Sequence, residues 1–432
     1  MSIAVCTLFL ATLVYAIVTN SDLFSPAKFY LLSFMIFYFG ALTNDAKYQL
    51  WLLVLLVLMA GMVAVVVEAL SPVPRVSRLA LKVRREADPP HFLMWIWSLS
   101  LPGVLAEAFL IHNFGGLQGY INMIGTRVVE FRGFGWATTL TATLMAFNLA
   151  YFAVGLTRRR TALWWSAYWA HFAILLVTGF LSGSRSAVLN IFVMQLFCYH
   201  YLRKNVRLPQ AVTIAVILLV CAMILGVVRN GIKFEGDTLV TGLQQRDSVV
   251  ELSTIHYGEA PLQILLDADH LQLVYGMTFL SLVTNAIPRD WWPDKPDSGG
   301  IVFTKIYTAD AWNGLSNLAP TYLGEGIMNF GWALGIAFFM ATYPALMYYT
   351  VWYYRRVIVR VRAAPDAQAA LDLAQYVLVA WAIVALMTGE VTNILLGLLL
   401  TRIIPLQVLR AALGLHGSRV PQLRRASIGA RA

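Results

Sequence analysis

The fold class is decided by residues 48–70, which have the sequence YQLWLLVLLVLMAGMVAVVVEAL. An apolar run of this kind has the length that an α-helix needs to cross the hydrocarbon core of a bilayer. Hydrophobic residues make up 59% of the 432-residue chain and charged residues only 12%. A soluble protein could not cover this composition with polar surface, so the sequence predicts a polytopic membrane protein with one integral domain over residues 1–432.

Similar runs recur along the chain and predict an all-α fold with about eleven transmembrane helices. The alternation that a membrane β-barrel requires is not visible, and the first run lacks the basic start and cleavage site of a signal peptide. Residues 271–287 are apolar but short for a span. They predict a re-entrant or interfacial helix, or an extra crossing that would change the count. The expected spans are residues 2–19, 27–43, 48–70, 92–112, 134–156, 162–181, 186–202, 209–228, 326–354, 370–389 and 391–411.

Lys and Arg are concentrated in every second connection, and this pattern predicts the orientation of the chain. Basic residues follow the third, fifth, seventh and ninth runs and fill the C-terminal tail. By the positive-inside rule these connections face the cytoplasm. The net charge of +10 therefore reflects topology, and no signature of nucleic-acid binding accompanies it. The outward connections are residues 44–47, 113–133, 182–185, 229–325 and Glu390, of which 113–133 and 229–325 are long.

Two arginines lie on the outward side, where the positive-inside bias disfavours them. Arg185 follows a Ser-Gly-Ser turn between two apolar runs, and Arg229 ends the eighth run. At each position, free backbone N–H groups at a helix end and a neighbouring guanidinium could together form a phosphate-binding site. The alternative is that both side chains extend from helix ends to the lipid headgroups.

The segment from Asn285 to Pro296 is dense in charged, aromatic and proline residues within the long outward loop. Three prolines stiffen the backbone around Arg289 and Lys295, so these cations could be held in a fixed geometry. Trp291 and Trp292 are candidate platforms for apolar sugar faces, or anchors at the membrane interface.

Acids and a histidine supply candidate bases. Glu325 and Asn329 lie near the start of the ninth run, where an acid is stabilised by the helix dipole or could take a proton from a hydroxyl. His256 is the second candidate, although a lone surface histidine more often has no catalytic role. Three groups are weaker candidates. Arg127, Glu130 and Arg132 could guide an acidic substrate, but we expect them to pair with each other. The others are Glu259, near His256, and the acids Glu107 and Glu390, for which Arg402 or another buried cation is a possible partner.

No cofactor or metal site is expected. The three cysteines, Cys6, Cys198 and Cys221, lie inside apolar runs without paired spacing and are interpreted as packing residues. The sequence contains no nucleotide-binding loop and no nucleophile elbow.

An ordered set of short motifs runs through residues 180–335. It comprises Ser182-Gly183-Ser184-Arg185, Arg229, Ile287-Pro288-Arg289, Trp292-Pro293-Asp294-Lys295-Pro296, Gly324-Glu325-Gly326 and Asn329-Phe330-Gly331. This set, with the number of spans and the long outer loop, resembles the Wzy-type O-antigen polymerases, which are oligosaccharide repeat-unit polymerases of Gram-negative bacteria.

The resemblance implies a glycosyltransferase of the multi-span C type in the inner membrane, with its active site facing the periplasm. Such an enzyme transfers a glycan from undecaprenyl diphosphate to the non-reducing end of a new lipid-linked repeat unit, without a nucleotide sugar. A chain-length co-polymerase is a candidate partner. In this interpretation Arg185, Arg229 and Arg289 hold the diphosphate with support from Lys295, and Glu325 or else His256 activates the acceptor hydroxyl.

Two other functions remain open. An O-antigen ligase, which transfers the finished glycan to lipid A core, has a related architecture and usually a histidine in its active loop, so His256 keeps this option. A transporter of lipid or glycan would be expected to have paired broken helices in two related halves and ionisable residues near mid-membrane. The sequence has no internal repeat and its polar residues gather at one face, which disfavours transport.

Overall fold

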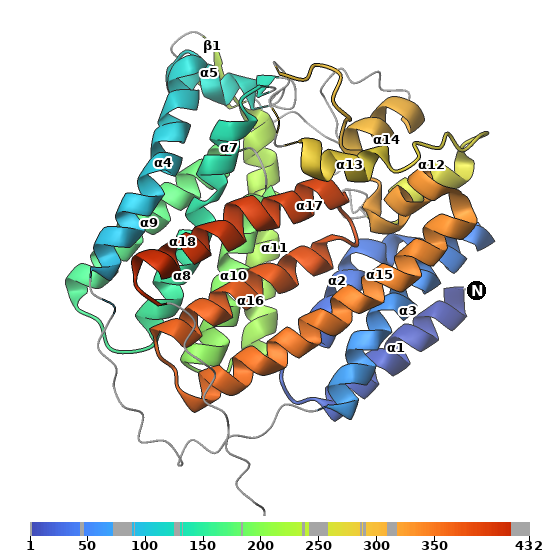
Figure 1. The fold of residues 1–432 in the computed structure, drawn as a ribbon, viewed down its shortest axis with the longest axis horizontal. Helices are drawn as coiled ribbons and strands as arrows, with labels where there is room; N and C mark the ends of the chain where they lie inside the picture. Colours follow the sequence, from blue (N-terminus) through green and yellow to red (C-terminus); the bar gives the residue numbers. More distant parts are fainter. Residues whose placement is uncertain are drawn as a thin grey trace, which may run out of the picture.

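The chain forms a bundle of long helices in this computed structural model, which describes residues 2–43, 47–71, 89, 91–124, 130–131, 133–182, 185–235, 238–241, 258–285, 287, 291–308 and 318–415 (Figure 1). In the first half these are α1 Ser2–Thr19, α2 Pro26–Thr43, α3 Tyr48–Leu70, α4 Phe92–Asn113, α5 Gly116–Met123, α7 Gly135–Ala142, α8 Leu144–Leu156, α9 Ala162–Leu181, α10 Arg185–Leu202 and α11 Leu208–Gly231.

The second half contains a β-hairpin, three short helices and three further long segments. Strands β1 Ile232–Glu235 and β2 Thr238–Thr241 pair antiparallel, with Ile232 opposite Thr241. The helices are α12 Ala260–Asp267, α13 Met277–Thr284, α14 Gly299–Tyr307, α15 Thr321–Ala363, α16 Ala367–Ala385, and α17 Val391–Leu398 continued by a π-helical segment Leu399–Ile403 and α18 Ile404–Ala412.

The prediction of an all-α membrane protein is confirmed at the level of fold class. Eight helical segments of the described chain are long and apolar enough to cross a membrane: α1, α3, α4, α7 with α8, α9, α15, α16, and residues 391–412. The remaining three predicted runs are helical as α2, α10 and α11, so a count of eleven spans stays a prediction. Helix α13, at eight residues, is about 12 Å long and too short to cross, which favours the re-entrant or interfacial interpretation of residues 271–287.

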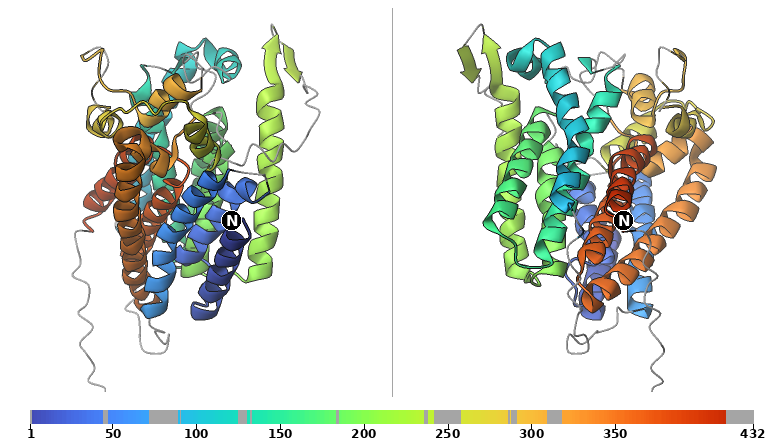
Figure 2. Two further views of the ribbon diagram at one scale, coloured as in Figure 1. Left: turned by 90° about the vertical axis from the view of Figure 1, so that its right-hand side faces the viewer. Right: turned by 60° about the vertical axis from the view of Figure 1, so that its left-hand side comes forward.

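The two ends of the bundle differ. Figure 1 shows α5, the hairpin and α12–α14 gathered at one end, which we call the cap end, and Figure 2 shows the hairpin extending from α11 at this end. At the opposite end lie the connections α8–α9, α10–α11 and α15–α16. We call it the basic end because its described residues include Arg158, Arg159, Arg160, Arg203, Lys204, Arg207, Arg355, Arg356, Arg360 and Arg362.

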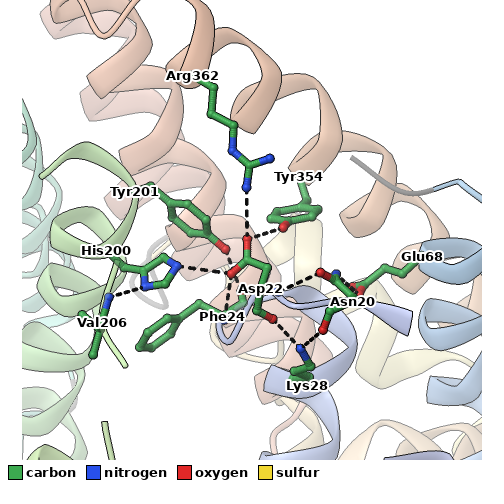
Figure 3. A network of polar contacts seen from close by, with 10 residues as sticks. All are labelled: Asn20, Asp22, Phe24, Lys28, Glu68, His200, Tyr201, Val206, Tyr354 and Arg362. Carbon is green, nitrogen blue, oxygen red and sulfur yellow. Dashed lines mark hydrogen bonds and ion pairs between the residues drawn. The ribbon is translucent and has the colours of Figure 1, made fainter. Parts of the chain in front are cut away.

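A buried carboxylate organises the basic end (Figure 3). Asp22, between α1 and α2, accepts a hydrogen bond from the Tyr354 hydroxyl at 2.5 Å and lies 3.3 Å from Nε2 of His200. Arg362 approaches the same carboxylate at 3.8 Å. The Asp22 side chain is 7% exposed. One acid therefore joins the α1–α2 connection to α10 and to the end of α15.

The core consists of two large clusters that share α15 and α16. One is formed with α4, α8, α9 and α10, and the other with α1, α2 and α3. Helix α16 buries many alanines, among them Ala369, Ala370 and Ala374. Small residues allow close helix approach, which matters in lipid because packing contacts replace the hydrophobic effect as the driving force between helices.

Helix α15 is broken at Gly331, where φ is 80° and ψ is 175°. A positive φ is readily adopted only by glycine. The hydroxyl of Tyr322 donates to Thr342 Oγ1 at 2.7 Å, although twenty residues of straight helix would hold them about 30 Å apart. The short arm, residues 321–330, must therefore fold back onto the long arm, and residues 321–329 are all buried. The prediction of a single run beginning at residue 326 missed this arm.

Candidate functional site

Two buried carboxylates meet where the cap joins the membrane helices. Glu325, on the short arm of α15, accepts a hydrogen bond through Oε2 from the backbone N–H of Val391 at 2.8 Å. Glu390, at the N-cap of α17, accepts one through Oε2 from the backbone N–H of Gly300 in α14. Their exposed fractions are 0% and 3%. Each acid thus holds the N-terminus of a helix other than its own.

Each of these carboxylates keeps one buried oxygen, Oε1, without a hydrogen bond of normal geometry among the described residues, although the hydroxyls of Thr278 and Ser298 lie near Glu325 and Glu390 respectively. Buried polar atoms normally have a partner, so such an atom needs an explanation. The backbone of α14 approaches closely: a Cβ added to Gly299 would lie 2.8 Å from Glu325 Oε1. The helix N-termini of α14 and α17 supply positive partial charge to the two acids. The dipole interaction expected for Glu325 is therefore provided by α17, not by the start of its own helix.

Hydroxyl and amide groups surround this pair. Asn329 Nδ2 donates to Thr278 Oγ1 at 2.6 Å and to the Glu325 carbonyl at 2.7 Å. Ser281 and Thr392 share a hydrogen bond of 2.7 Å. These residues tie α13 to the short arm and to α17. The amide oxygen of Asn329 has no hydrogen-bond partner among the described residues.

Lys295 holds together the proline-rich segment from Asn285 to Pro296, which we call the proline-rich corner. Its ammonium donates to the carbonyl of Asn285 at 3.1 Å and to that of Ile287 at 2.5 Å, and the residue is 8% exposed. These bonds anchor the chain on both sides of position 289. In the structure Lys295 therefore holds residues 285–295 together, and its supporting role towards a diphosphate stays a prediction. Trp291 and Trp292 are 82% and 40% exposed, so both present apolar surface at the cap end.

Four predicted residues have no described side chain. Arg289 and His256 lie outside the described residues. For Arg185 and Arg229 the structure describes only the helix position: α10 starts at Arg185, and Arg229 is close to the end of α11. Both positions lie at the cap end (Figure 1). The convergence of the three arginines on one diphosphate stays a prediction.

The weaker candidates have varied surroundings. Glu107 is buried and accepts from the Tyr120 hydroxyl at 3.2 Å. Glu130 is exposed, and Arg127 and Arg132 lie outside the described residues. Glu259 is buried at the N-cap of α12. Arg402 lies on the π-helical segment of the last span, and none of the ion pairs between described residues joins it to Glu107 or Glu390. Among described residues, therefore, no ion pair joins Arg402 to either acid, and Glu390 instead accepts a hydrogen bond from the backbone N–H of Gly300.

Sequence reasoning missed three members of the cluster: Thr278, Ser281 and Thr392. A weak signal existed, since each is a hydroxyl residue inside an otherwise apolar segment. No local sequence pattern could show that they lie together, because the hydrogen bond between Ser281 and Thr392 joins positions 111 residues apart. For Glu390 the sequence signal is general: an acid beside a span is a functional candidate by default.

Comparisons of the chain with protein-family models, with curated proteins and with solved structures found no match.

Proposed function

We propose that this protein is a membrane glycosyltransferase that polymerises lipid-linked oligosaccharide repeat units at its cap end. The observation that carries the proposal is the buried pair Glu325, on the folded-back arm of the broken helix α15, and Glu390, at the start of α17, both in contact with the first turn of another helix. Non-helical backbone inside a membrane bundle is tolerated only where protein or a cavity surrounds it, and it often marks a functional site. The motif resemblance of residues 180–335 to O-antigen polymerases supplies the reaction class.

In the proposed reaction an acceptor hydroxyl at the non-reducing end of one lipid-linked repeat unit attacks the anomeric carbon of a second lipid-linked glycan. A new C–O glycosidic bond forms as the bond between the anomeric carbon and the diphosphate oxygen breaks. The hydroxyl proton passes to a carboxylate or imidazole base, and undecaprenyl diphosphate leaves with the bonding electron pair. No nucleotide sugar is consumed.

Glu325 is the first candidate for the base. Oε2 is held by Val391, which fixes the carboxylate, while Oε1 accepts no hydrogen bond of normal geometry from a described residue. A fixed base with one free oxygen meets the geometric requirement for taking a proton from a positioned hydroxyl. Because Glu325 is fully buried, substrate binding would have to open a path to it from the cap. His256 is the second candidate.

The leaving diphosphate requires positive charge. Arg185, Arg229 and Arg289 are the proposed ligands, since guanidinium groups bind phosphate oxygens through paired hydrogen bonds. Stabilising charge that develops in the transition state is usually a large contribution to catalysis. The exposed Trp291 and Trp292 offer stacking surface for sugar rings next to this site.

The test is reconstitution. Purified protein in liposomes, supplied with undecaprenyl-diphosphate-linked repeat units, is expected to yield a ladder of longer lipid-linked glycans without nucleotide sugar. Protein with Arg289→Ala serves as the matched control and should give none. Consumption of repeat units only when lipid A core is present would indicate a ligase instead.

The break in α15 favours one second candidate, transport of a lipid-linked glycan, because transporters commonly use discontinuous helices. Reconstitution separates the two functions. A transporter would move the lipid-linked unit between leaflets and leave its glycan at the original length.

A further inference from the structure

A cavity of about 260 Å³ lies at the basic end, between the α8–α9 connection and the end of α10. Four arginines line it: Arg158, Arg159, Arg160 and Arg203. They come from two connections that are more than 40 positions apart in the sequence. The positive-inside rule explains why arginines occur in these connections, but it does not require them to surround one cavity.

Arg160 is held in place by its neighbours. Its Nη2 donates to the carbonyl of Val154 at 2.8 Å, and its guanidinium carbon lies 4.1 Å from the ring centre of Trp164. A guanidinium stacked on an indole gains a cation–π contribution. Arg159 and Arg203 are exposed. The cavity therefore combines one anchored cation with others that can adjust to a ligand.

Next to the cavity an apolar strip faces outward along α9. Trp165 lines the cavity, and one turn further on Trp169 is 58% exposed. Val177, about two turns beyond Trp169 on the exposed face of the helix, is 56% exposed. In a spanning helix such surface contacts acyl chains, and tryptophan is enriched at the headgroup level. A ligand in the cavity would thus have a charged group among arginines and an apolar part along α9.

We propose that this cavity binds the phosphate headgroup of an anionic glycerophospholipid from the leaflet at the basic end. Basic pockets between transmembrane helices recognise such headgroups, because guanidinium groups pair with phosphate oxygens. The adjoining apolar strip favours a lipid over a free anion, which would gain nothing from that surface. The proposal does not depend on the proposed glycan chemistry, which lies at the other end of the bundle.

The test compares two double variants in nanodiscs. Arg159→Ala with Arg203→Ala removes two exposed cations that line the cavity. Lys204→Ala with Arg207→Ala removes the same charge from exposed positions of the α10–α11 connection that do not line it. Binding of phosphatidylglycerol or cardiolipin, relative to phosphatidylcholine, is measured by native mass spectrometry. We expect the cavity variant to bind anionic lipid about tenfold more weakly and the control variant to change by about twofold or less.

Two results would overturn the proposal. Equal weakening in both variants would mean that the lipid responds to diffuse charge, not to this cavity. Inorganic phosphate or glycerol phosphate that displaces the lipid completely at low millimolar concentration would mean that the cavity selects a soluble anion. Size-exclusion profiles and far-UV circular dichroism establish that both variants are folded. Photo-crosslinking with an anionic lipid analogue, mapped by mass spectrometry, should label α9 near Trp169 in the unchanged protein.

Discussion

The carboxylate of Glu325 accepts a hydrogen bond from the backbone N–H of Val391, 66 positions further along the chain and 2.8 Å away. This bond joins the short arm of α15 to the first turn of α17. Glu390, one residue before Val391, binds Gly300 in turn. The start of α17 is therefore bound by the short arm of α15 through Val391, and it binds the cap helix α14 through Glu390.

Glu325→Gln tests the role of this carboxylate. Glutamine keeps the size and can accept the Val391 hydrogen bond through its amide oxygen, but it cannot take up a proton in the reaction. We expect the folded variant to lose at least about a hundredfold in polymerisation rate. The measurement is the ladder of lipid-linked products, and exposed Glu130→Gln is the control, expected to keep full activity. A Glu325→Gln protein with a normal ladder would show that Glu325 only orients other groups and would leave His256 as the base.

Arg289→Ala should abolish polymer formation while the protein stays folded, because its proposed partner is the diphosphate. Lys295→Met should behave differently. It removes the donor to two carbonyls of the corner, and we expect a loss of about 1–3 kcal/mol in unfolding free energy together with a shorter, still visible ladder. Thermal unfolding and product gels measure the two effects. Full activity of Arg289→Ala would remove this residue from the site.

Gly299→Ala should destabilise the protein, because the new Cβ would lie 2.8 Å from the Glu325 carboxylate. Overfilling a packed site of this kind costs about 1–3 kcal/mol. In the matched substitution Gly397→Ala, in α17, the new Cβ meets no atom within 4 Å, so the unfolding temperature should stay the same or rise slightly, because alanine favours the helix more than glycine does. Equal unfolding temperatures for both variants would mean that α14 can shift away from Glu325 without cost.

Asp22→Asn should destabilise the basic end in a pH-dependent way. Burial raises the pKa of Asp22, but hydrogen bonds with His200 and Tyr354 outweigh it, so its pKa lies below the ordinary value of 3.8. The charged form therefore contributes stability above that value, which is lost as the pH falls through the lower folded-state pKa. At pH 7 we expect the variant to lose about 1–3 kcal/mol.

Unfolding temperatures recorded in detergent between pH 7 and pH 3 check this prediction. The difference between the unchanged protein and Asp22→Asn should stay constant down to about pH 5 and shrink below about pH 4. Exposed Asp267→Asn, which loses a surface ion pair with Lys47, is the control and should change little. A difference that does not depend on pH would show that packing, not charge, accounts for the effect of Asp22.

The long helices were predictable from sequence because bilayer thickness imposes their length and composition. Each predicted run, such as residues 48–70, coincides with helical residues in the structure. The short features were not predictable in this way. The run from 134 to 156 is divided into α7 and α8, and the hairpin β1–β2 lies in a stretch expected to be loop.

The break in α15 has a local signal in the sequence. Gly331 follows Asn329-Phe330 in an apolar stretch, and an isolated glycine in a helical pattern is a candidate break. The partners of Glu325 and Glu390 had no such signal. Val391 and Gly300 contribute backbone N–H groups, which every residue except proline possesses, so only the fold selects them.

The two hydrogen bonds at Glu325 and Glu390 act in series, so α14 cannot lift away from the bundle without disturbing the start of α17. In a polymerase, a lengthening product must leave the site at every cycle. We therefore expect each cycle to couple the opening of the site to a shift at the start of the last span, and the glycan to leave across the exposed rings of Trp291 and Trp292.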